Sequence, residues 1–373
     1  MTEVTKVPFA IVLACLLPLF VHFSWSMLDD ARQASAIALV LTSVASYIVV
    51  RLSPSWNLAG YSVVIPVKKA VLITGCDSGF GHALVKKLDA YMFSTVFAAC
   101  LNPDGDGAKK LTAECSKRVV VLPLDVSSDE SVASAMKIID ETLIKRNHDL
   151  WAVVNNAGIW TCADIEFAPV ERFKKLAEVN VYGTVRVTKA CLKHIRRNKG
   201  RVVNVTSISG LWTIPSNAEY CMTKYALECF SDTLRHEMHQ WGVKVSIVEP
   251  GPYAKATKIG LNLWEEFERS SNALWDNVDD SIKRQYGKAY FDSHIDWWKS
   301  ALADTYDDGT PVVDAMVHAV WSINPKHRYL IGGFFNTKLT AFIMNVLPSY
   351  LTDKIFFRQL SHYVKPACLR KSL

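Results

Sequence analysis

Tyr220 and Lys224 lie four residues apart, and Ser207 stands 13 residues before Tyr220. On a helix, residues at this spacing share a face, so the lysine ammonium can lie beside the tyrosine phenol. A tyrosine has an ordinary pKa of about 10, and a nearby positive charge lowers it. A serine hydroxyl from a neighbouring strand end can hold a carbonyl or alkoxide oxygen. The three residues therefore predict proton transfer at a carbon–oxygen bond.

A glycine-rich turn, Thr-Gly-Cys-Asp-Ser-Gly-Phe-Gly, occupies residues 74–81. It follows the apolar run 70–73 and precedes a stretch of helical periodicity at 82–88. Glycines let the backbone approach a pyrophosphate, and a helix N-terminus offers free N–H groups. The glycine spacing differs from the common G-x-G-x-x-G fingerprint. The prediction of a dinucleotide site therefore depends on the strand–turn–helix context.

The rest of the chain from residue 67 alternates between expected strands and helices. Several strands are continuous runs of Val, Ile and Leu, typical of strands covered on both faces. Strands are expected at 70–74, 95–99, 119–124, 151–155, 201–205, 244–248 and 329–331. The clearest helices are expected at 131–146, 171–197 with a break near Gly183, and 219–240. This order predicts an α/β fold, a doubly wound parallel sheet of the Rossmann-like type.

Two apolar stretches, 8–28 and 34–52, precede this domain. Each is close to the roughly 20 residues that span a bilayer as a helix, so we expect a transmembrane hairpin within residues 1–66. A cleaved signal peptide is an alternative for the first stretch, and one span plus one interfacial helix is another. Lys6, Arg51, Lys68 and Lys69 flank the hairpin, which favours a cytosol-facing catalytic domain. That domain is expected at 67–335, followed by an apolar and basic tail at 336–373.

Residues 252–308 interrupt the alternation and are rich in tryptophan. An insertion after the sixth strand could close over an apolar substrate as a lid. A surface helix pair with core tryptophans is the alternative, and the two interpretations are compatible.

The charge and cysteine content narrow the class of protein. The formal net charge of +6 comes without a basic block interleaved with aromatics, so nucleic-acid binding is not supported. The positive net charge does fit contact with anionic lipid. The nine cysteines match neither a disulfide framework nor a zinc site, and we expect no metal. A reducing compartment is expected for the catalytic domain.

The motifs together resemble the short-chain dehydrogenase/reductase family. The T-G-x-x-x-G-x-G pattern, the Asn-Asn-Ala-Gly run at 155–158, Ser207, Tyr220, Lys224 and the Pro250-Gly251 turn occur in that family's order. The resemblance covers about residues 68–330. It is closest to the membrane-associated branch of 17β-hydroxysteroid (type 2), retinol and D-3-hydroxybutyrate dehydrogenases. The strings at 75–81, 200–205 and 286–292 are similar to the hydroxybutyrate enzymes, whereas the apolar N-terminal region is more like the steroid enzyme.

The resemblance implies roles for four catalytic residues. Tyr220 would be the acid/base, and Ser207 would position the substrate oxygen. Lys224 would bind the nicotinamide ribose and lower the Tyr220 pKa. Asn180 would hold a water that relays protons past Lys224.

The resemblance also implies a dinucleotide site. Its expected residues are Gly75, Ser78, Gly79, Phe80 and Gly81 at the pyrophosphate, Asp125 and Val126 at the adenine, Asn155, Ala157 and Gly158 at the ribose, and Pro250 and Gly251 at the nicotinamide, with Tyr220 and Lys224. The family usually has Thr four residues beyond Gly251, where this chain has Lys255 and then Thr257. No Arg follows the second strand, and Asp104 and Asp106 would repel a 2′-phosphate, so NAD is favoured over NADP.

We therefore expect a membrane-anchored NAD-dependent dehydrogenase of an apolar alcohol, a steroid or retinoid. It would reside in the endoplasmic reticulum membrane as a homo-oligomer, by analogy with the family. The alternative enzyme is a mitochondrial D-3-hydroxybutyrate dehydrogenase. The carboxylate of that small substrate needs a cation in the pocket, such as Lys255 or Lys258. A nucleotide-sugar epimerase shares Tyr-x-x-x-Lys but usually opens with a different glycine loop. A catalytically idle dinucleotide sensor or scaffold is the alternative from another class.

Overall fold

The computed structural model describes residues 62–257, 271–332, 340–341, 344, 346–360 and 364–370. The hairpin expected at 8–28 and 34–52, the lid residues Lys258 and Trp264, and the basic terminus beyond Arg370 lie outside these ranges. Within these ranges, no helix is both long enough and apolar enough to cross a membrane.

Seven parallel strands form one sheet in the order β3-β2-β1-β4-β5-β6-β7. The strands are β1 (Lys69–Thr74), β2 (Thr95–Cys100), β3 (Val119–Pro123), β4 (Asp149–Asn155), β5 (Arg201–Val205), β6 (Lys244–Pro250) and β7 (Arg328–Ile331). All seven expected strands are present. The start of β4 lies two residues before its expected position, because the Asp149 N–H donates to the Lys68 carbonyl at 2.8 Å. The predicted doubly wound parallel sheet is confirmed.

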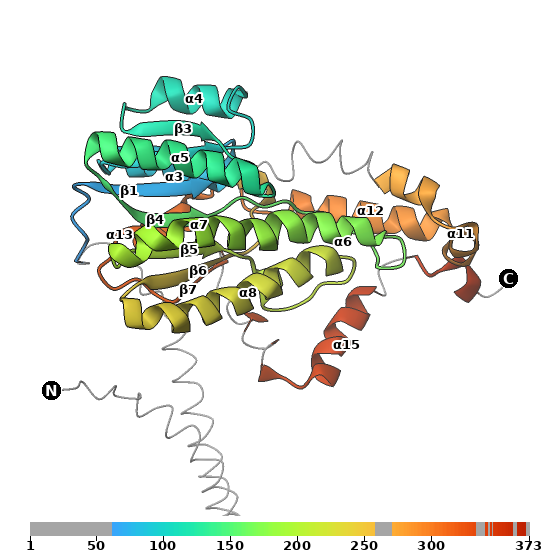
Figure 1. The fold of residues 1–373 in the computed structure, drawn as a ribbon. Helices are drawn as coiled ribbons and strands as arrows, with labels where there is room; N and C mark the ends of the chain where they lie inside the picture. The colour runs from blue at the N-terminus through green and yellow to red at the C-terminus, as the bar shows by residue number, and fades with distance from the viewer. Residues whose placement is uncertain are drawn as a thin grey trace, which may run out of the picture. The chain divides into compact units, whose positions relative to one another are not determined.

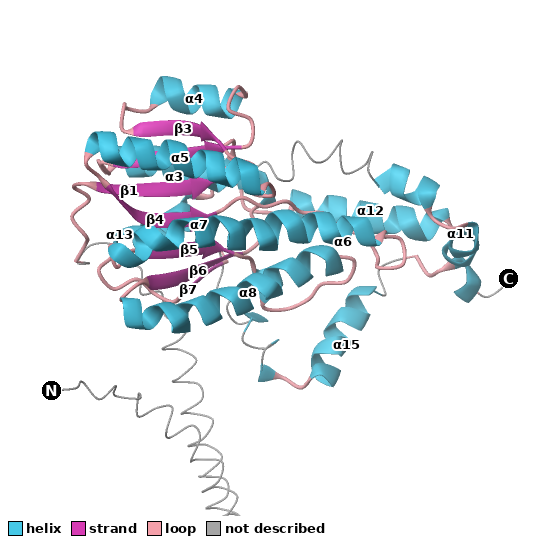
Figure 2. Cartoon of the chain, in the orientation of Figure 1, coloured by secondary structure: helices cyan, strands magenta, loops and turns pink. Residues whose placement is uncertain are grey.

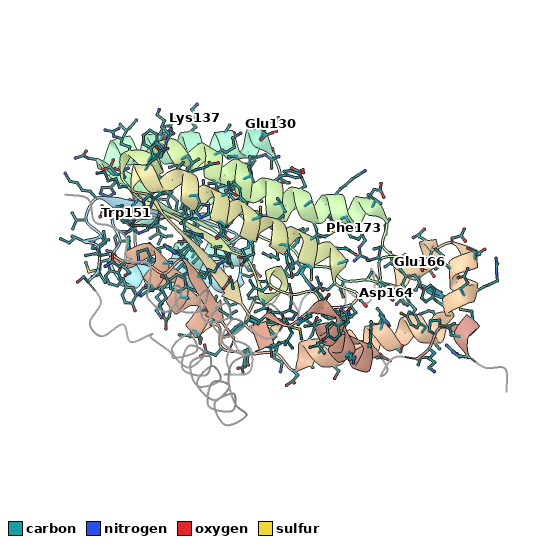
Figure 3. All side chains as sticks on the ribbon, turned by 90° about the horizontal axis from the view of Figure 1, so that it is seen from below. Glu130, Lys137, Trp151, Asp164, Glu166 and Phe173 are labelled. Carbon is teal, nitrogen blue, oxygen red and sulfur yellow. The ribbon has the colours of Figure 1, made fainter. Side chains whose placement is uncertain are left out.

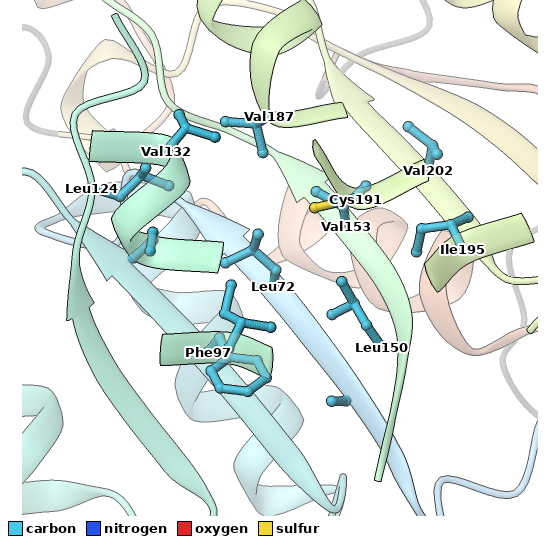
Figure 4. Packing of buried hydrophobic residues seen from close by; sticks show 14 of the residues in the cluster. Leu72, Phe97, Leu124, Val132, Leu150, Val153, Val187, Cys191, Ile195 and Val202 are labelled. Carbon is cyan, nitrogen blue, oxygen red and sulfur yellow. The ribbon is translucent and has the colours of Figure 1, made fainter. Parts of the chain in front are cut away.

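Helices cover both faces of this sheet (Figure 1). One face carries α3 (Gly79–Ala90), α4 (Asp106–Glu114) and α13 (Thr310–Trp321). The other face carries α5 (Asp129–Arg146), α7 (Gly183–Arg197) and α8 (Ala218–Met238). The main core between the sheet and α5 and α7 is apolar (Figure 4), and includes Leu72, Phe97, Val132, Leu150, Val153, Val187, Cys191 and Ile195.

The helical stretch expected at 171–197 has a wide turn where a break was predicted. It comprises α6 (Val170–Ala177), a π-helical turn η1 (Glu178–Tyr182) and α7. At the start of α7, a Cβ on Gly183 would lie 2.7 Å from Val126 Cγ2. The glycine therefore lets the helix pass close to the segment that follows β3, and the π turn absorbs the extra residue.

The expected lid region contains α9 (Ala254–Thr257), α11 (Asp280–Tyr286) and α12 (Lys288–Ala303). Helices α11 and α12 lie beyond the carboxyl ends of the strands (Figure 2). Further along the chain come α15 (Ser349–Leu360) and the short 3₁₀ helix η4 (Ala367–Leu369). Short 3₁₀ turns also occur at η2 (Ile208–Gly210) and η3 (His239–Trp241).

Candidate active site

The glycine turn and the Asn-Asn-Ala-Gly run meet between β1 and β4, where the strand order changes direction. Gly75 has φ +69°, and a Cβ there would lie 2.8 Å from Ala157 Cα. A Cβ on Gly81 would lie 2.4 Å from the Gly75 carbonyl oxygen. Both positions therefore exclude a side chain. Crevices at such a switch point are where doubly wound sheets bind ligands.

Two residues that sequence reasoning did not single out as site residues join these loops. The Thr74 hydroxyl accepts hydrogen bonds from the N–H groups of Asn156 and Ala157, both at 3.0 Å. The Asn156 amide donates back to the carbonyls of Thr74 at 2.9 Å and Gly75 at 3.1 Å. The usable signal was a polar residue at the end of the otherwise apolar strand β1.

The loop fits a dinucleotide pyrophosphate. Helix α3 begins at Gly79 with no acidic residue in its first turn, and the side chain of the preceding Ser78 makes no capping hydrogen bond. The first N–H groups of such a helix are free to bind an anion. Phe80 packs edge-on against Tyr253 with ring centroids 5.8 Å apart, which holds the loop against the segment after β6.

Ser207, Tyr220 and Lys224 come together at the carboxyl end of β5. Ser207 follows β5, while Tyr220 and Lys224 lie on the first two turns of α8. Ser207 and Tyr220 are joined by a side-chain hydrogen bond. The Lys224 ammonium lies 5.3 Å from the Tyr220 ring centroid and donates to the Val205 carbonyl at 3.1 Å. The structure therefore brings the three predicted catalytic residues together.

The protonation of this group differs from the sequence expectation. Burial raises the pKa of Tyr220, and its hydrogen bond with Ser207 opposes that rise. Burial also lowers the pKa of Lys224 to about 8, against the charge of Glu228. The expected lowering of the Tyr220 pKa by Lys224 does not appear, because desolvation disfavours the charged form of both groups.

Asn180 lies on the π turn and is fully buried. Its side-chain oxygen accepts the Ile159 N–H at 2.8 Å, and its amide donates to the Ile159 carbonyl at 2.9 Å. The amide also donates to the Thr223 hydroxyl at 3.1 Å. A Cβ on Gly158 would lie 3.3 Å from the Asn180 oxygen and 3.8 Å from Lys224 Nζ. Asn180 therefore fixes the loop after β4 beside the catalytic lysine.

Asp125 and Asn155, both expected at the cofactor, make local contacts. The Asp125 carboxylate accepts hydrogen bonds from the Ser127 N–H at 2.9 Å and hydroxyl at 2.6 Å. The buried Asn155 amide donates to Thr188 at 2.9 Å and Asn204 at 2.8 Å. The Asn155 side chain thus ties β4 to α7 and β5.

The turn after β6 lies over the glycine loop. Pro250 ends β6, and the Gly251 N–H donates to the Ile331 carbonyl at 2.8 Å. In α9, Lys255 is exposed whereas Thr257 is buried. A Cβ on Gly79 would lie 3.0 Å from the Thr257 carbonyl oxygen. Thr257 is therefore the better placed of the two to face the pyrophosphate loop.

A buried ion pair includes Glu219, the residue before Tyr220, and sequence reasoning missed it. Glu219 is 1% exposed and pairs with Arg172 of α6 at 3.1 Å. The Thr161 hydroxyl donates to the same carboxylate at 2.5 Å. These contacts hold the start of α8 against α6 and the loop after β4. No short motif marks the pair, since its members are 47 residues apart.

An apolar cluster, called here the aromatic wall and defined as Trp160, Ile214 and Trp298, is linked to the start of α8. The Trp160 indole N–H donates to the side-chain oxygen of Asn217 at 3.1 Å. The ring centroids of Trp160 and Trp298 are 5.4 Å apart in an edge-to-face arrangement. Ile214 and the buried Cys162 pack in the same cluster. Trp160 stands two residues after Gly158, where a Cβ would lie 3.8 Å from Lys224 Nζ. Trp160 belongs to none of the sequence motifs described above, so its position in this cluster could be found only in the structure.

The parallel sheet and the glycine turn at its switch point are typical of dinucleotide-dependent oxidoreductases. Residues 69–266 match the family model for short chain dehydrogenases. The chain belongs to the short-chain dehydrogenase family, whose members act on CH–OH groups with NAD or NADP.

The chain is 42% identical over 290 residues to mitochondrial D-beta-hydroxybutyrate dehydrogenase of Bos taurus, covering 77% of this chain and 83% of that one. It is 36% identical over 325 residues to estradiol 17-beta-dehydrogenase 2 of Mus musculus, covering 86% and 82%. A short-chain dehydrogenase structure from Streptomyces avermitilis matches with a TM-score of 0.59 and 23% identity over 79% of this chain and 97% of that one. That structure supports the fold alone.

Proposed function

We propose that this protein is an NAD-dependent dehydrogenase of an apolar secondary or primary alcohol, a steroid or a retinoid. The observation that carries the proposal is the aromatic wall beside the catalytic group. Trp298 is 8% exposed and packs on Trp160, two residues from the glycine that borders Lys224. Tryptophans supply large apolar contact surfaces, which suit a polycyclic or polyene substrate better than a small carboxylate.

The residues of the site support a defined division of labour. Ser207, already hydrogen-bonded to Tyr220, would hold the substrate oxygen beside the phenol. Tyr220 would take the hydroxyl proton during oxidation and return it during reduction. Lys224 would reach the cofactor ribose and supply positive charge when protonated. A bound nicotinamide would accept or donate the hydride.

Asp77 of the glycine turn supports the preference for NAD. Its carboxylate accepts the N–H groups of Leu101 and Asn102, both at 2.9 Å. These contacts fix a negative charge at the end of β2, where a dinucleotide places its adenosine ribose. A carboxylate there can accept a ribose hydroxyl and would repel a 2′-phosphate.

D-3-Hydroxybutyrate is the second candidate substrate, favoured by the 42% identity to the bovine enzyme. Such a substrate needs a cation for its carboxylate. Arg172, close to the wall, is already paired with Glu219 at 3.1 Å, and Lys255 is exposed. The described residues therefore support this substrate less well than an apolar one.

The remaining parts of the proposal concern the setting of the enzyme. The domain limits 1–66, 67–335 and 336–373 are retained, with the first acting as a membrane anchor. The endoplasmic reticulum, with the catalytic domain in the cytosol, is the proposed location, and the mitochondrial membrane is the alternative. Homo-oligomers are proposed to form through α7 and α8.

A nicotinamide absorbance assay on the detergent-solubilised full chain tests the proposal. We expect estradiol, testosterone or all-trans-retinol to be oxidised with NAD faster than with NADP. Turnover of D-3-hydroxybutyrate alone would contradict the apolar substrate. Cofactor binding without turnover of any of these four substrates would favour the alternative of a catalytically idle dinucleotide sensor.

A further inference from the structure

A buried polar cluster joins the lid helix α12 to two loops of the core. We call it the lid clasp and define it as Asp164, Ser216, Tyr290 and His294. The Ser216 hydroxyl donates to the Asp164 carboxylate and contacts His294 Nδ1 at 3.0 Å. The Tyr290 hydroxyl donates to Asp164 at 2.9 Å. The clasp therefore links the loops after β4 and β5 to consecutive turns of α12.

Ser216 and His294 of the clasp are buried, and Asp164 and Tyr290 are half-buried. His294 is 5% exposed and its Nδ1 lies 3.2 Å from the Asp164 carboxylate. Burial acts to raise the pKa of Asp164, but the hydrogen bond and charge of His294 and the hydrogen bonds of Ser216 and Tyr290 hold it below its ordinary value. A fully connected buried network specifies one arrangement, because each broken bond leaves a costly unpaired group.

The backbone of Ser216 is adapted to this position. Its φ is +61°, in the left-handed region that residues other than glycine seldom adopt. The surrounding structure must over-determine such a conformation. Here the hydroxyl of Ser216 reaches the clasp, while the next residue, Asn217, accepts the Trp160 indole N–H at 3.1 Å. Two consecutive residues thus hold the lid and the aromatic wall.

The same two residues lead directly into the catalytic helix. Asn217 occupies the N-cap position of α8, three residues before Tyr220. On the lid side, Trp298 follows His294 by one helical turn and packs against Trp160. The clasp therefore connects Tyr220 and Trp298 through a short path of fixed contacts.

Two hollows flank the clasp. An open cavity of about 520 Å³ borders it on one side and is lined also by Glu166 and Tyr286. A void of about 20 Å³ borders it on the other side, next to Cys162 and Trp298. Asp164 and Glu166 lie where the core meets the lid helices (Figure 3). Loosening the clasp would therefore detach α12, which carries Trp298, from the loops after β4 and β5.

We propose that the lid clasp positions the aromatic wall over Tyr220, so that Asp164, Ser216 and His294 determine the affinity for apolar substrates. They act through Trp298 and Trp160 without touching the reacting atoms. The proposal rests on the function proposed above. A wall that contacts substrate and transition state equally affects KM and leaves kcat unchanged.

The test compares three variants of the full chain. His294→Leu removes the contacts of His294 with Ser216 and Asp164, and His294→Asn restores a polar group at the place of Nδ1. His318→Leu is the control, because it removes a histidine that is equally buried but lies outside the clasp. His318 is on α13, is 6% exposed and is hydrogen-bonded to Tyr329 of β7 at 2.7 Å. We expect KM for the preferred apolar alcohol to rise about tenfold in His294→Leu with kcat within about threefold. His294→Asn should recover most of the lost affinity, and His318→Leu should lower Tm without changing KM.

Hydrogen exchange separates failure of this proposal from failure of the proposed function. Amides of α12 and of the loop carrying Trp160 should exchange faster in His294→Leu than in His318→Leu, whichever substrate the enzyme uses. Unchanged amide exchange in α12 would overturn the proposed role of the clasp. Equal KM values in His294→Leu and the wild type would overturn it as well. Faster exchange in a protein that oxidises only D-3-hydroxybutyrate would uphold the clasp and refute the apolar substrate.

Discussion

At the scale of single residues, burial of the Lys224 ammonium lowers the stability of the folded protein. It is 5% exposed, and burial lowers its pKa from 10.5 to about 8. A shift of this size corresponds to a cost on the order of 3 kcal/mol at neutral pH. The hydrogen bond to the Val205 carbonyl offsets part of it, about 1 kcal/mol. A buried lysine that destabilises the fold is what a functional site predicts.

Lys224→Met should therefore raise the free energy of unfolding at pH 7, by on the order of 1 kcal/mol, while abolishing turnover. The unfolded lysine binds a proton up to pH 10.5 but the folded one only up to about 8. Wild-type stability thus rises with pH across this window. The advantage of the variant should be full below pH 8 and disappear near pH 10.5. Urea unfolding at several pH values measures it, and a variant less stable at pH 7 would contradict the account.

Asp77 gives a second prediction at this scale, on cofactor choice. Asp77→Asn removes the charge at the end of β2 but keeps an oxygen for one of the two backbone N–H groups. The ratio of kcat/KM for NADP to that for NAD should rise about tenfold or more. Asp149→Asn makes the same charge change at the start of β4 and should leave the ratio unaltered. Equal ratios in both variants would exclude Asp77 from the ribose site.

At the scale of elements, the π turn η1 connects helix geometry to the site. It places the fully buried Asn180 so that both backbone groups of Ile159 are satisfied. An uninterrupted α-helix would rotate this residue out of register. The loop after β4, which carries Gly158 and Trp160, therefore depends on one side chain.

Asn180→Leu should lower the free energy of unfolding by about 2–4 kcal/mol, because two buried backbone groups lose their partners. It should also reduce kcat, since the loop beside Lys224 is released. Thr223→Val removes one partner of Asn180 and should cost only about 1 kcal/mol. Thermal unfolding and steady-state kinetics check both variants, and equal effects would argue against the special role of Asn180.

The sequence predicted the strands and the order of the motifs because both depend on local patterns. Apolar runs marked the strands, several of them continuous in Val, Ile and Leu, and the Tyr220–Lys224 spacing marked one helix face. The contacts of Asp164, Ser216 and His294 were not predictable, because they join residues 52 and 78 apart. Asp, Ser and His are ordinary surface residues, and only packing of the lid on the core makes them a network. The predicted direction of the Tyr220 pKa shift was also wrong, because the burial of this side chain was not visible in the sequence.

At the scale of the whole molecule, α8 presents an exposed apolar stripe. Met222 and Tyr225 are 61% and 42% exposed, and Cys229 is exposed one turn further. Residues at this spacing lie on one helix face. Tyr182, on the neighbouring π turn, is 56% exposed. Such a surface suits an interface between two copies of the chain.

Tyr225→Glu should shift the protein from dimer or higher oligomer to monomer, because a charge in an apolar interface is costly to bury. Met92→Glu changes an equally apolar residue, 66% exposed on the turn after α3, and should leave the oligomer intact. Sedimentation velocity in detergent distinguishes the species. A monomeric wild type, or dissociation by both variants, would rule out this interface.

We propose that Tyr220 catalyses oxidation of an apolar alcohol with NAD. The most direct measurement compares wild type and Tyr220→Phe in the absorbance assay with estradiol, testosterone, all-trans-retinol and D-3-hydroxybutyrate. The account predicts turnover of a steroid or retinol, reduced at least about 100-fold in the variant, with NAD binding retained. Undiminished turnover in Tyr220→Phe, or wild-type turnover of D-3-hydroxybutyrate alone, would contradict it.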